Sequence, residues 1–297
     1  MSQYTKVRET IPVTLKESLG SLYKYIKPNL VILDVGCSSG YFGQMLIKEK
    51  KATVDGVEYN SEDAKQAQKV LRNVYSFDLD GSDWPKELLE NKYDLIFFGD
   101  VLEHLKDPGT VLKKFSKLLS KSGKVIISIP NIAHGSIRLE LLSGSFEYEE
   151  LGILDNTHLK YFTFNSFVRL LAESGYKVLA TDQITIPMSK DTIDTYINNL
   201  GLRTTDKFYT IMHSAEATAF QYKFLAELGK PSKSVLRPKK PKEISHAYMV
   251  EINKLSTDNI ELKEKEKELE SIKNSTSWKV TKPMRDVKGY FVKRKKA

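Results

Sequence analysis

The sequence has 297 residues, of which 40% are hydrophobic and 28% are charged, and this composition is typical of a soluble globular protein with one α/β domain and an extension, or with two domains. No apolar stretch approaches the roughly 18–20 residues of a membrane span, and the N-terminal residues 1–6 lack the apolar run and the cleavage site of a signal peptide. The single cysteine, Cys37, excludes an internal disulfide framework and indicates a reducing compartment, so we expect a cytoplasmic protein.

The net charge of +8 is distributed unevenly along the chain. Residues 229–297 hold 19 of the 46 basic and 9 of the 38 acidic residues, a net charge of +10, which leaves residues 1–228 at −2. A nearly neutral main part argues against a nucleic-acid groove, because such a groove needs a basic surface. The basic C-terminal part is compatible with contact to an anionic membrane surface or another polyanion.

Helical and strand-like patterns alternate through most of the chain. We expect helices at residues 13–27, 41–48, 61–71, 108–119 and 164–173, and strands at residues 31–33, 52–59, 74–77, 93–98, 124–129 and 176–186. Ser61 is the expected N-cap of its helix. Residues 132–163 are expected to be irregular and 188–213 helical, while 220–226 alternate like a final strand, with a helix as the competing interpretation. Strands separated by helices predict a doubly wound, mostly parallel, seven-stranded α/β sheet.

The composition changes after residue 228. We expect a domain at residues 1–228 with a helical insertion at about 188–213, a linker at 229–242, an exposed helix at 243–273 and a basic tail at 274–297. Leucines recur every seven residues at 255, 262 and 269, which is compatible with a short coiled coil. The tail contains aromatic residues among its lysines, which is compatible with contact to a membrane surface. The alternative is a solvated helix at 243–273 followed by a disordered basic end.

A small-residue turn follows the first strand and marks the ligand site. Its glycines, at positions 36, 40 and 43, do not follow the Gly-x-Gly-x-x-Gly pattern of dinucleotide-binding turns, and no Gly-Lys-Ser/Thr of a P-loop follows. Asp34 stands directly before the turn, where it repels a pyrophosphate and suits a cation. We therefore favour a positively charged ligand without phosphate groups.

The stretch Leu33-Asp34-Val35-Gly36-Cys37-Ser38-Ser39-Gly40 resembles the first motif of class I S-adenosylmethionine-dependent methyltransferases, with Ser38 in place of a glycine. Three later positions match that family: Glu58 at the end of the second strand, Asp78 after the third, and Phe98–His104 after the fourth. The resemblance implies S-adenosylmethionine as cofactor, with Glu58 accepting from both ribose hydroxyls and Asp78 from the adenine amino group. The implied cofactor residues are Asp34, Gly36, Cys37, Ser38, Gly40, Tyr41, Glu58, Tyr59, Asp78, Leu79 and Asp100.

Each of these residues also has a simpler interpretation. Asp34 is compatible with a helix cap, and Glu58 or Asp78 alone would be an ordinary turn acid. Cys37 is interpreted as a small turn residue rather than a nucleophile, and Tyr41 either packs or lines the cofactor pocket. The joint placement of the acids in order along the chain favours the functional interpretation.

Methyl transfer from a sulfonium needs proximity, and a hydroxyl acceptor also has to lose its proton. His158 is the first candidate base because Asp155, three residues earlier, could orient its ring. His104, one turn beyond Asp100, is the second candidate, and His134 is a weaker one. Spacing does not establish a metal site from Asp100, Asp155 and Asn156, so we predict none.

Two further stretches indicate a substrate class. Residues 155–163, Asp-Asn-Thr-His-Leu-Lys-Tyr-Phe-Thr, are similar to a segment of bacterial methyltransferases encoded with polysaccharide enzymes, and residues 274–285 resemble a segment of enzymes of O-antigen or capsule assembly. The resemblance implies O-methylation of a sugar hydroxyl. From the heptad pattern of residues 243–273 we expect self-association or a partner such as a glycosyltransferase, and from the basic tail contact with the inner membrane face, where lipid-linked glycans are made. The alternatives are methylation of a quinone or amino sugar, and a methyltransferase-like scaffold that only binds.

Overall fold

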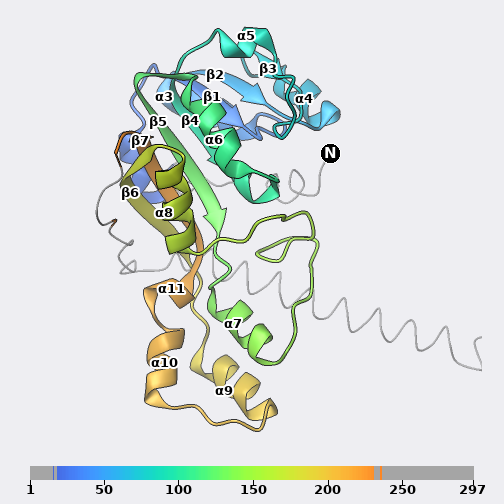
Figure 1. The fold of residues 1–297 in the computed structure, drawn as a ribbon, viewed down its shortest axis with the longest axis vertical. Coiled ribbons are helices and arrows are strands. Elements are labelled where there is room, and N and C mark those ends of the chain that lie inside the picture. Colours follow the sequence, from blue (N-terminus) through green and yellow to red (C-terminus); the bar gives the residue numbers. More distant parts are fainter. Residues whose placement is uncertain (1–15, 17–18, 231–234, 236–297) are drawn as a thin grey trace, which may run out of the picture. The chain divides into compact units, whose positions relative to one another are not determined.

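The computed structural model describes residue 16, residues 19–230 and residue 235, and its centre is a seven-stranded sheet (Figure 1). The strand order is β3-β2-β1-β4-β5-β7-β6. The strands are β1 (Val31–Val35), β2 (Thr53–Val57), β3 (Val74–Tyr75), β4 (Tyr93–Gly99), β5 (Leu119–Pro130), β6 (Tyr176–Thr185) and β7 (Ala219–Leu228). The predicted α/β sheet is confirmed, and it is mixed, because β7 runs antiparallel to both β5 and β6.

The chain starts in the middle of the sheet and winds outward in both directions. β1 pairs in parallel with β2 on one side and with β4 on the other, so the winding direction reverses between β1 and β4. In open α/β sheets, ligands bind outside the carboxyl ends of the strands at such a reversal. The topology therefore puts the ligand site where β1, β2 and β4 end.

Helices cover both faces of the sheet. They are η1 (Gly20–Tyr25), α3 (Tyr41–Lys50), α4 (Ser61–Ala67), α5 (Lys86–Leu89), η2 (Leu102–His104), α6 (Pro108–Ser116), α7 (Gly135–Leu142), α8 (Phe164–Glu173), α9 (Lys190–Asn199), α10 (Asp206–Met212) and α11 (Ala215–Thr218). Alternate residues of a strand point to opposite faces. Ile32 of β1 therefore joins the core under α3 and η1, while Leu33 and Val35 join the core under α6 and α8.

Most predicted elements are confirmed, and the exceptions have local causes. Residues 164–173 form α8 as predicted, and residues 220–226 lie within strand β7, not in a helix. The N-cap of α4 is Asn60 rather than Ser61, because the Asn60 side chain accepts from the N–H groups of Glu62 and Asp63. Of the helix predicted at 13–27, the described residues show helical backbone at residues 16 and 19 and the 3₁₀ helix η1, while residues 13–15 and 17–18 lie outside the described part.

The region predicted to be irregular, residues 132–163, contains helix α7. Its N-cap is His134, whose side chain accepts from the N–H group of Ser136, and a histidine is a cap that sequence rules do not favour. Helices α7, α9, α10 and α11 lie beyond the carboxyl end of β5 (Figure 1), and α9 and α10 fall within the stretch 188–213 that was predicted to be helical.

Among the described residues, no helix combines the length and the apolar composition that a membrane crossing requires. The predicted exposed helix, coiled coil and basic tail, as well as most of the linker, lie outside the described residues.

Candidate cofactor and acceptor sites

The turn after β1 is shaped by three residues with left-handed backbone angles. The φ angles are +73° at Gly36, +49° at Ser38 and +83° at Gly40. A Cβ atom at Gly36 would lie 2.6 Å from a methyl group of Val101, and one at Gly40 would lie 2.8 Å from a methyl group of Val70. Glycine is therefore required at both positions, and Ser38 takes a conformation that elsewhere favours glycine.

Glu58 is tied to this turn from the end of β2. One carboxylate oxygen accepts from the N–H group of Ser38 at 2.8 Å, and the other accepts from the N–H group of Asn60, also at 2.8 Å. A carboxylate has about four acceptor positions, so these two bonds hold its orientation and leave acceptor capacity on both oxygens. This arrangement fits two vicinal ribose hydroxyls, the partners that the sequence predicts for Glu58.

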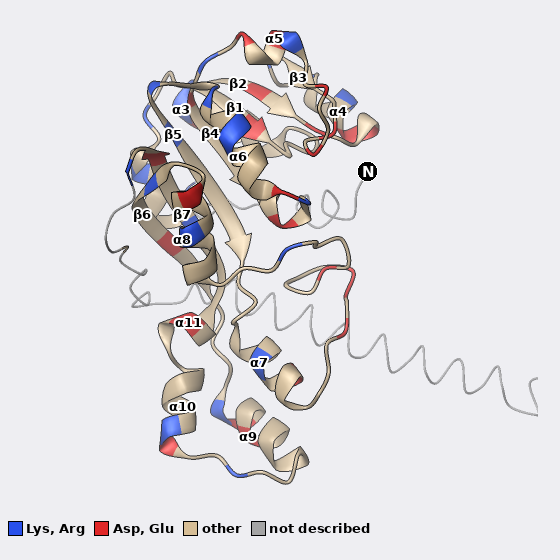
Figure 2. Cartoon of the chain, viewed as in Figure 1, with Lys and Arg blue, Asp and Glu red and all other residues tan. Residues whose placement is uncertain are grey.

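The electrostatic surroundings of the turn are acidic. The pKa of the Cys37 thiol is raised, first by burial and then by the charges of Asp34, Glu58 and Asp63, so this cysteine is held as a neutral thiol. The pKa of Glu58 itself is raised by burial, and the N–H groups of Asn60 and Ser38 oppose this rise. Acidic residues also gather around α4 and the loop after β3 (Figure 2). This field suits a sulfonium and disfavours a pyrophosphate.

The remaining predicted cofactor residues lie along the same edge, with different degrees of burial. Asp34 and Cys37 are buried, Tyr41 and Leu79 are half-buried, and Tyr59 and Asp78 are exposed. The side chain of Cys37 packs in the core beneath α3, so only its backbone belongs to the turn, and its N–H donates to the Val57 carbonyl. The Asp78 carboxylate accepts from the N–H of Asp80, which holds it at the edge of the sheet.

Asp100, at the end of β4, is held by two residues that the sequence did not single out. Its φ angle is +54°, and its carboxylate accepts from the Ser128 hydroxyl at 2.9 Å and from the Gln221 amide at 2.7 and 2.8 Å. Gln221 comes from β7, 121 residues later in the chain, and no local signal could have identified it. The two donors fix the orientation of the Asp100 carboxylate at the end of β4.

The two predicted bases, His104 and His158, lie together. Their ring centroids are 4.8 Å apart, and the rings are nearly perpendicular. Nδ1 of His158 is 3.0 Å from the carbonyl oxygen of Ile153, and Nδ1 of His104 is 3.0 Å from the hydroxyl oxygen of Thr157 and 3.3 Å from its carbonyl oxygen. Because a carbonyl only accepts, both Nδ1 atoms carry hydrogen, so the neutral form of either ring has its lone pair on Nε2.

The Asp155 carboxylate, predicted to orient His158, is bound to Thr157, and its role toward His158 stays a prediction. The Asp155 carboxylate accepts from both the N–H and the hydroxyl of Thr157, at 2.8 and 2.5 Å, and it is the Ile153 carbonyl that binds the His158 ring. Asp155 thus fixes Thr157, which in turn fixes His104. The pKa of His104 is lowered by burial and by the neighbouring His158, so its ring is neutral at neutral pH.

Glu103 lies with the two histidines, and we call the three residues Glu103, His104 and His158 the acceptor-side cluster. The sequence did not single out Glu103. Its side chain is fully buried, and among the described residues neither carboxylate oxygen has a hydrogen-bond partner. Burial raises the pKa of Glu103 well above its ordinary value, and the charges of Asp100 and Asp155 add to the rise. Its position beside His104, in the turn after the fourth strand, was the signal available in the sequence.

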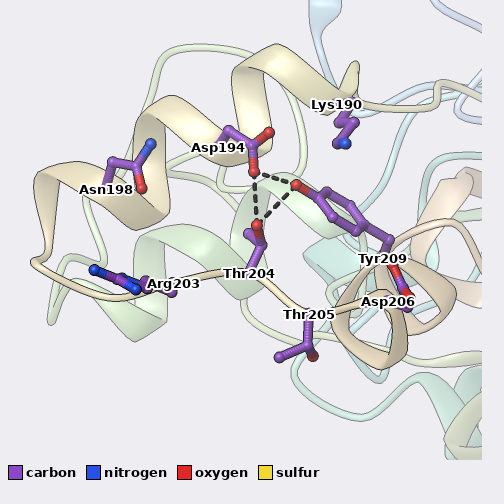
Figure 3. Close-up of a pocket in the computed structure, with 8 residues that line it drawn as sticks. All are labelled: Lys190, Asp194, Asn198, Arg203, Thr204, Thr205, Asp206 and Tyr209. Carbon is purple, nitrogen blue, oxygen red and sulfur yellow. Dashed lines mark hydrogen bonds between the residues drawn. The ribbon is translucent and has the colours of Figure 1, made fainter.

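A surface pocket lies in the helical insertion, between α9 and α10 (Figure 3). The Asp194 carboxylate accepts from the hydroxyl groups of Thr204 and Tyr209, and the ammonium group of Lys190 lies 4.9 Å from the centre of the Tyr209 ring. These polar groups bind one another, so we assign them the role of bracing the α9–α10 connection.

The sequence matches the methyltransferase domain family over residues 7–181. Two curated relatives are similar to the chain: the ubiquinone biosynthesis O-methyltransferase of Colwellia psychrerythraea, 25% identical over 154 residues, and the malonyl-[acyl-carrier protein] O-methyltransferase of Priestia megaterium, 24% identical over 155 residues. The alignments cover 51% and 52% of this chain, and 62% and 55% of the relatives. The chain therefore spans about three fifths of the length of the relatives it matches.

A similar fold occurs in the solved structure of an S-adenosylmethionine-dependent methyltransferase from Archaeoglobus fulgidus. The TM-score is 0.50 and the sequence identity is 17%, and the comparison covers 76% of this chain and 99% of the other. At this identity the likeness concerns the fold alone.

Proposed function

The chain belongs to the methyltransferase domain family, with S-adenosylmethionine as its cofactor, and we propose that it transfers the methyl group to a hydroxyl of a small molecule or glycan. The observation that carries this proposal is the Glu58 carboxylate, which the N–H groups of Ser38 and Asn60 hold beside the glycine turn at the reversal point of the sheet. It is placed to accept from the ribose hydroxyls.

When bound, the cofactor supplies a methyl group on a positively charged sulfur. Glu58 holds the ribose, Asp78 is positioned for the adenine amino group, and Asp34 and Asp100 add negative charge near the sulfonium. As the acceptor oxygen bonds to the methyl carbon, the carbon–sulfur bond breaks and the electron pair stays on sulfur, so the leaving group is neutral. The chain therefore contributes mainly positioning, which can lower the barrier by about 7–11 kcal/mol.

Loss of the acceptor proton is the second requirement, and we assign it to the acceptor-side cluster. His104 and His158 each keep a lone pair on Nε2, and both lie near the end of β4, next to Asp100. A hydroxyl acceptor needs this help, whereas a neutral amine needs less. The cluster thus favours O-methylation.

Within O-methylation, we propose a sugar hydroxyl in surface-polysaccharide synthesis as the acceptor. This rests on the resemblance of residues 155–163 and 274–285 to segments of polysaccharide enzymes. A quinone-type hydroxyl is the second candidate, because a relative is a ubiquinone biosynthesis O-methyltransferase. Mass spectrometry of surface glycans from cells with and without the protein separates them: loss of a methyl group from a sugar supports the first, and unchanged glycans contradict it.

Isothermal titration calorimetry with S-adenosylmethionine tests the proposed activity at its first step. We expect micromolar binding by the full chain, and competition by S-adenosylhomocysteine. If no binding is detected at these concentrations, the chain is a scaffold and the enzymatic proposal is wrong.

We also propose that residues 243–273 mediate self-association or contact with a glycosyltransferase. The protein is proposed to be cytoplasmic, with residues 274–297 in contact with the inner membrane face. A variant ending at residue 242 should keep cofactor binding and move to the soluble fraction of disrupted cells. An unchanged distribution between fractions would contradict this placement.

A further inference from the structure

A carboxylate and two imidazole rings converge on one point at the acceptor side. One ligand atom each from Glu103, His104 and His158 lies within 4.8 Å of the other two. We propose that these three residues bind a divalent first-row transition-metal cation, such as Zn²⁺, Mn²⁺ or Fe²⁺. Two imidazole nitrogens and one carboxylate oxygen, with further positions left open, form a ligand set that such cations take in enzymes.

The Glu103 carboxyl group is the first reason for this proposal. It is fully buried, and both oxygens lack hydrogen-bond partners among the described residues. A buried polar group left without a partner costs about 1–3 kcal/mol, and a charged one costs more. A cation bound by Glu103 would remove this cost.

The second reason is the way both histidine rings are held. Histidines that bind a metal usually donate their other ring N–H to a carboxylate, a backbone carbonyl or a water, which sets the tautomer. His158 donates from Nδ1 to the Ile153 carbonyl, and His104 donates from Nδ1 to Thr157, whose hydroxyl in turn binds Asp155. Both rings are therefore prepared to offer the lone pair of Nε2.

The backbone also holds His158, which is distant in sequence, close to Glu103 and His104. The Glu103 carbonyl oxygen accepts from the N–H groups of Leu159 and Lys160, at 2.8 and 2.9 Å, directly after His158. Ligand atoms around a tetrahedral zinc lie about 3.3 Å apart, given bond lengths near 2 Å. The ligand atoms therefore have to approach one another by up to about 1.5 Å, which side-chain torsions can supply without moving this backbone.

The charges and the exposure of the cluster agree with a cation. The carboxylates of Asp100 and Asp155 lie close enough to act on Glu103, so the local field is negative. Glu103 and His158 are buried, and His104 is partly exposed, so the site opens on the side of His104. An acceptor can reach the open coordination positions from there.

The role of the cation deepens the proposed function and rests on it. A hydroxyl bound to a divalent cation loses its proton more readily. In this role the acceptor O–H bond breaks and its proton leaves to water, the oxygen forms a bond to the methyl carbon, and S-adenosylhomocysteine departs. His104 and His158 then act as ligands and not as free bases.

Cobalt binding tests the site without an activity assay. The full chain is stripped with a chelator, dialysed and titrated with Co²⁺, and binding is followed by calorimetry and by the visible absorption of bound Co²⁺. We expect one Co²⁺ per chain in the wild type. Glu103→Gln, His104→Gln and His158→Gln should each weaken binding by more than about a hundredfold, since even second-shell changes cost 10–100-fold.

His213→Gln is the matched control, because His213 lies in the insertion and binds the Met188 carbonyl. It should bind Co²⁺ as the wild type does. Calorimetry with S-adenosylmethionine on every variant shows that the chain is folded and tests the proposed function separately. If the wild type binds S-adenosylmethionine but no Co²⁺, or if the three ligand variants keep wild-type Co²⁺ affinity, the metal site is wrong while the methyltransferase proposal stands.

Discussion

The carboxylates of Asp55, in β2, and Glu103, in η2, are both fully buried, but their surroundings are opposite. Asp55 accepts from the Arg72 guanidinium at 2.8 and 2.6 Å, from the Asn73 amide at 3.1 Å and from the Tyr93 hydroxyl at 2.8 Å. Glu103 has no such donor among the described residues.

This difference separates a structural carboxylate from one that is available to a ligand. The partners of Asp55 bind it within the protein, so the cost of burying its charge is offset there. Glu58 is intermediate, because two N–H groups hold it and both oxygens can still accept. Glu103 is at the other extreme, where only a proton or a cation can serve as partner.

The largest stability effect is expected at Asp55. Asp55→Asn removes the charge that binds Arg72 and presents an amide N–H₂ to other donors, so we expect a loss of about 2–4 kcal/mol in the free energy of unfolding. Urea denaturation measures it, with the exposed Asp191→Asn as the control. A loss no larger than that of the control would break the comparison, since Asp55 would then not be a structural carboxylate.

Glu58→Gln should act on ligand binding rather than on stability. Replacing a carboxylate acceptor of two hydroxyls costs about 1.5–3 kcal/mol, which is roughly a tenfold to hundredfold loss of S-adenosylmethionine affinity by calorimetry. Glu62→Gln makes the same change on the exposed first turn of α4 and should leave the affinity unchanged. Equal affinities of wild type and Glu58→Gln would refute the ribose assignment.

Thr157→Val tests the support behind His104. The valine is nearly isosteric but removes the hydroxyl that links Asp155 to His104, so we expect Co²⁺ affinity to fall about 10–100-fold. Thr157→Ser keeps the hydroxyl and should restore most of the affinity. Similar losses in both variants would show that packing, not the hydroxyl, matters.

Glu103→Gln should stabilise the metal-free protein at neutral pH, by about 1 kcal/mol or more, because the amide does not titrate and its unfolded state gains nothing by releasing a proton. The folded pKa of Glu103 lies above its unfolded value, so the folded protein keeps a proton that the unfolded chain releases. The free energy of unfolding of the wild type therefore falls as the pH rises above about 4.5, the ordinary pKa of a glutamate. The variant does not show this fall. Unfolding curves that stay parallel from pH 4 to 8 would contradict this assignment.

The cofactor edge could be predicted because its signals are local. Asp34, Gly36 and Gly40 fall within seven residues, and Glu58 and Asp78 each follow a strand whose carboxyl end must lie at the same edge of the sheet. The left-handed Ser38 could not be predicted in the same way, since the pattern favours glycine there. Its N–H bond to Glu58 shows what holds that conformation.

The acceptor side depends on contacts that separate parts of the chain make. Glu103 and His158 meet because the Glu103 carbonyl accepts from Leu159 and Lys160, and sequence spacing does not encode this pairing. The sequence predicts His158 as the partner of Asp155, and only the fold reveals the hydrogen bond from the Thr157 hydroxyl to the same carboxylate. The prediction about a metal site considered only Asp100, Asp155 and Asn156. It did not consider Glu103, which these long-range contacts bring to His158.

The most direct test is the unfolding free energy of the full chain with and without Co²⁺, measured in parallel on wild type and Glu103→Gln. A ligand that binds only the folded state at a hundred times its dissociation constant stabilises that state by about 2.7 kcal/mol. We predict a rise of this size for the wild type and none for Glu103→Gln. No rise in the wild type, or an equal rise in both proteins, would contradict a cation at Glu103.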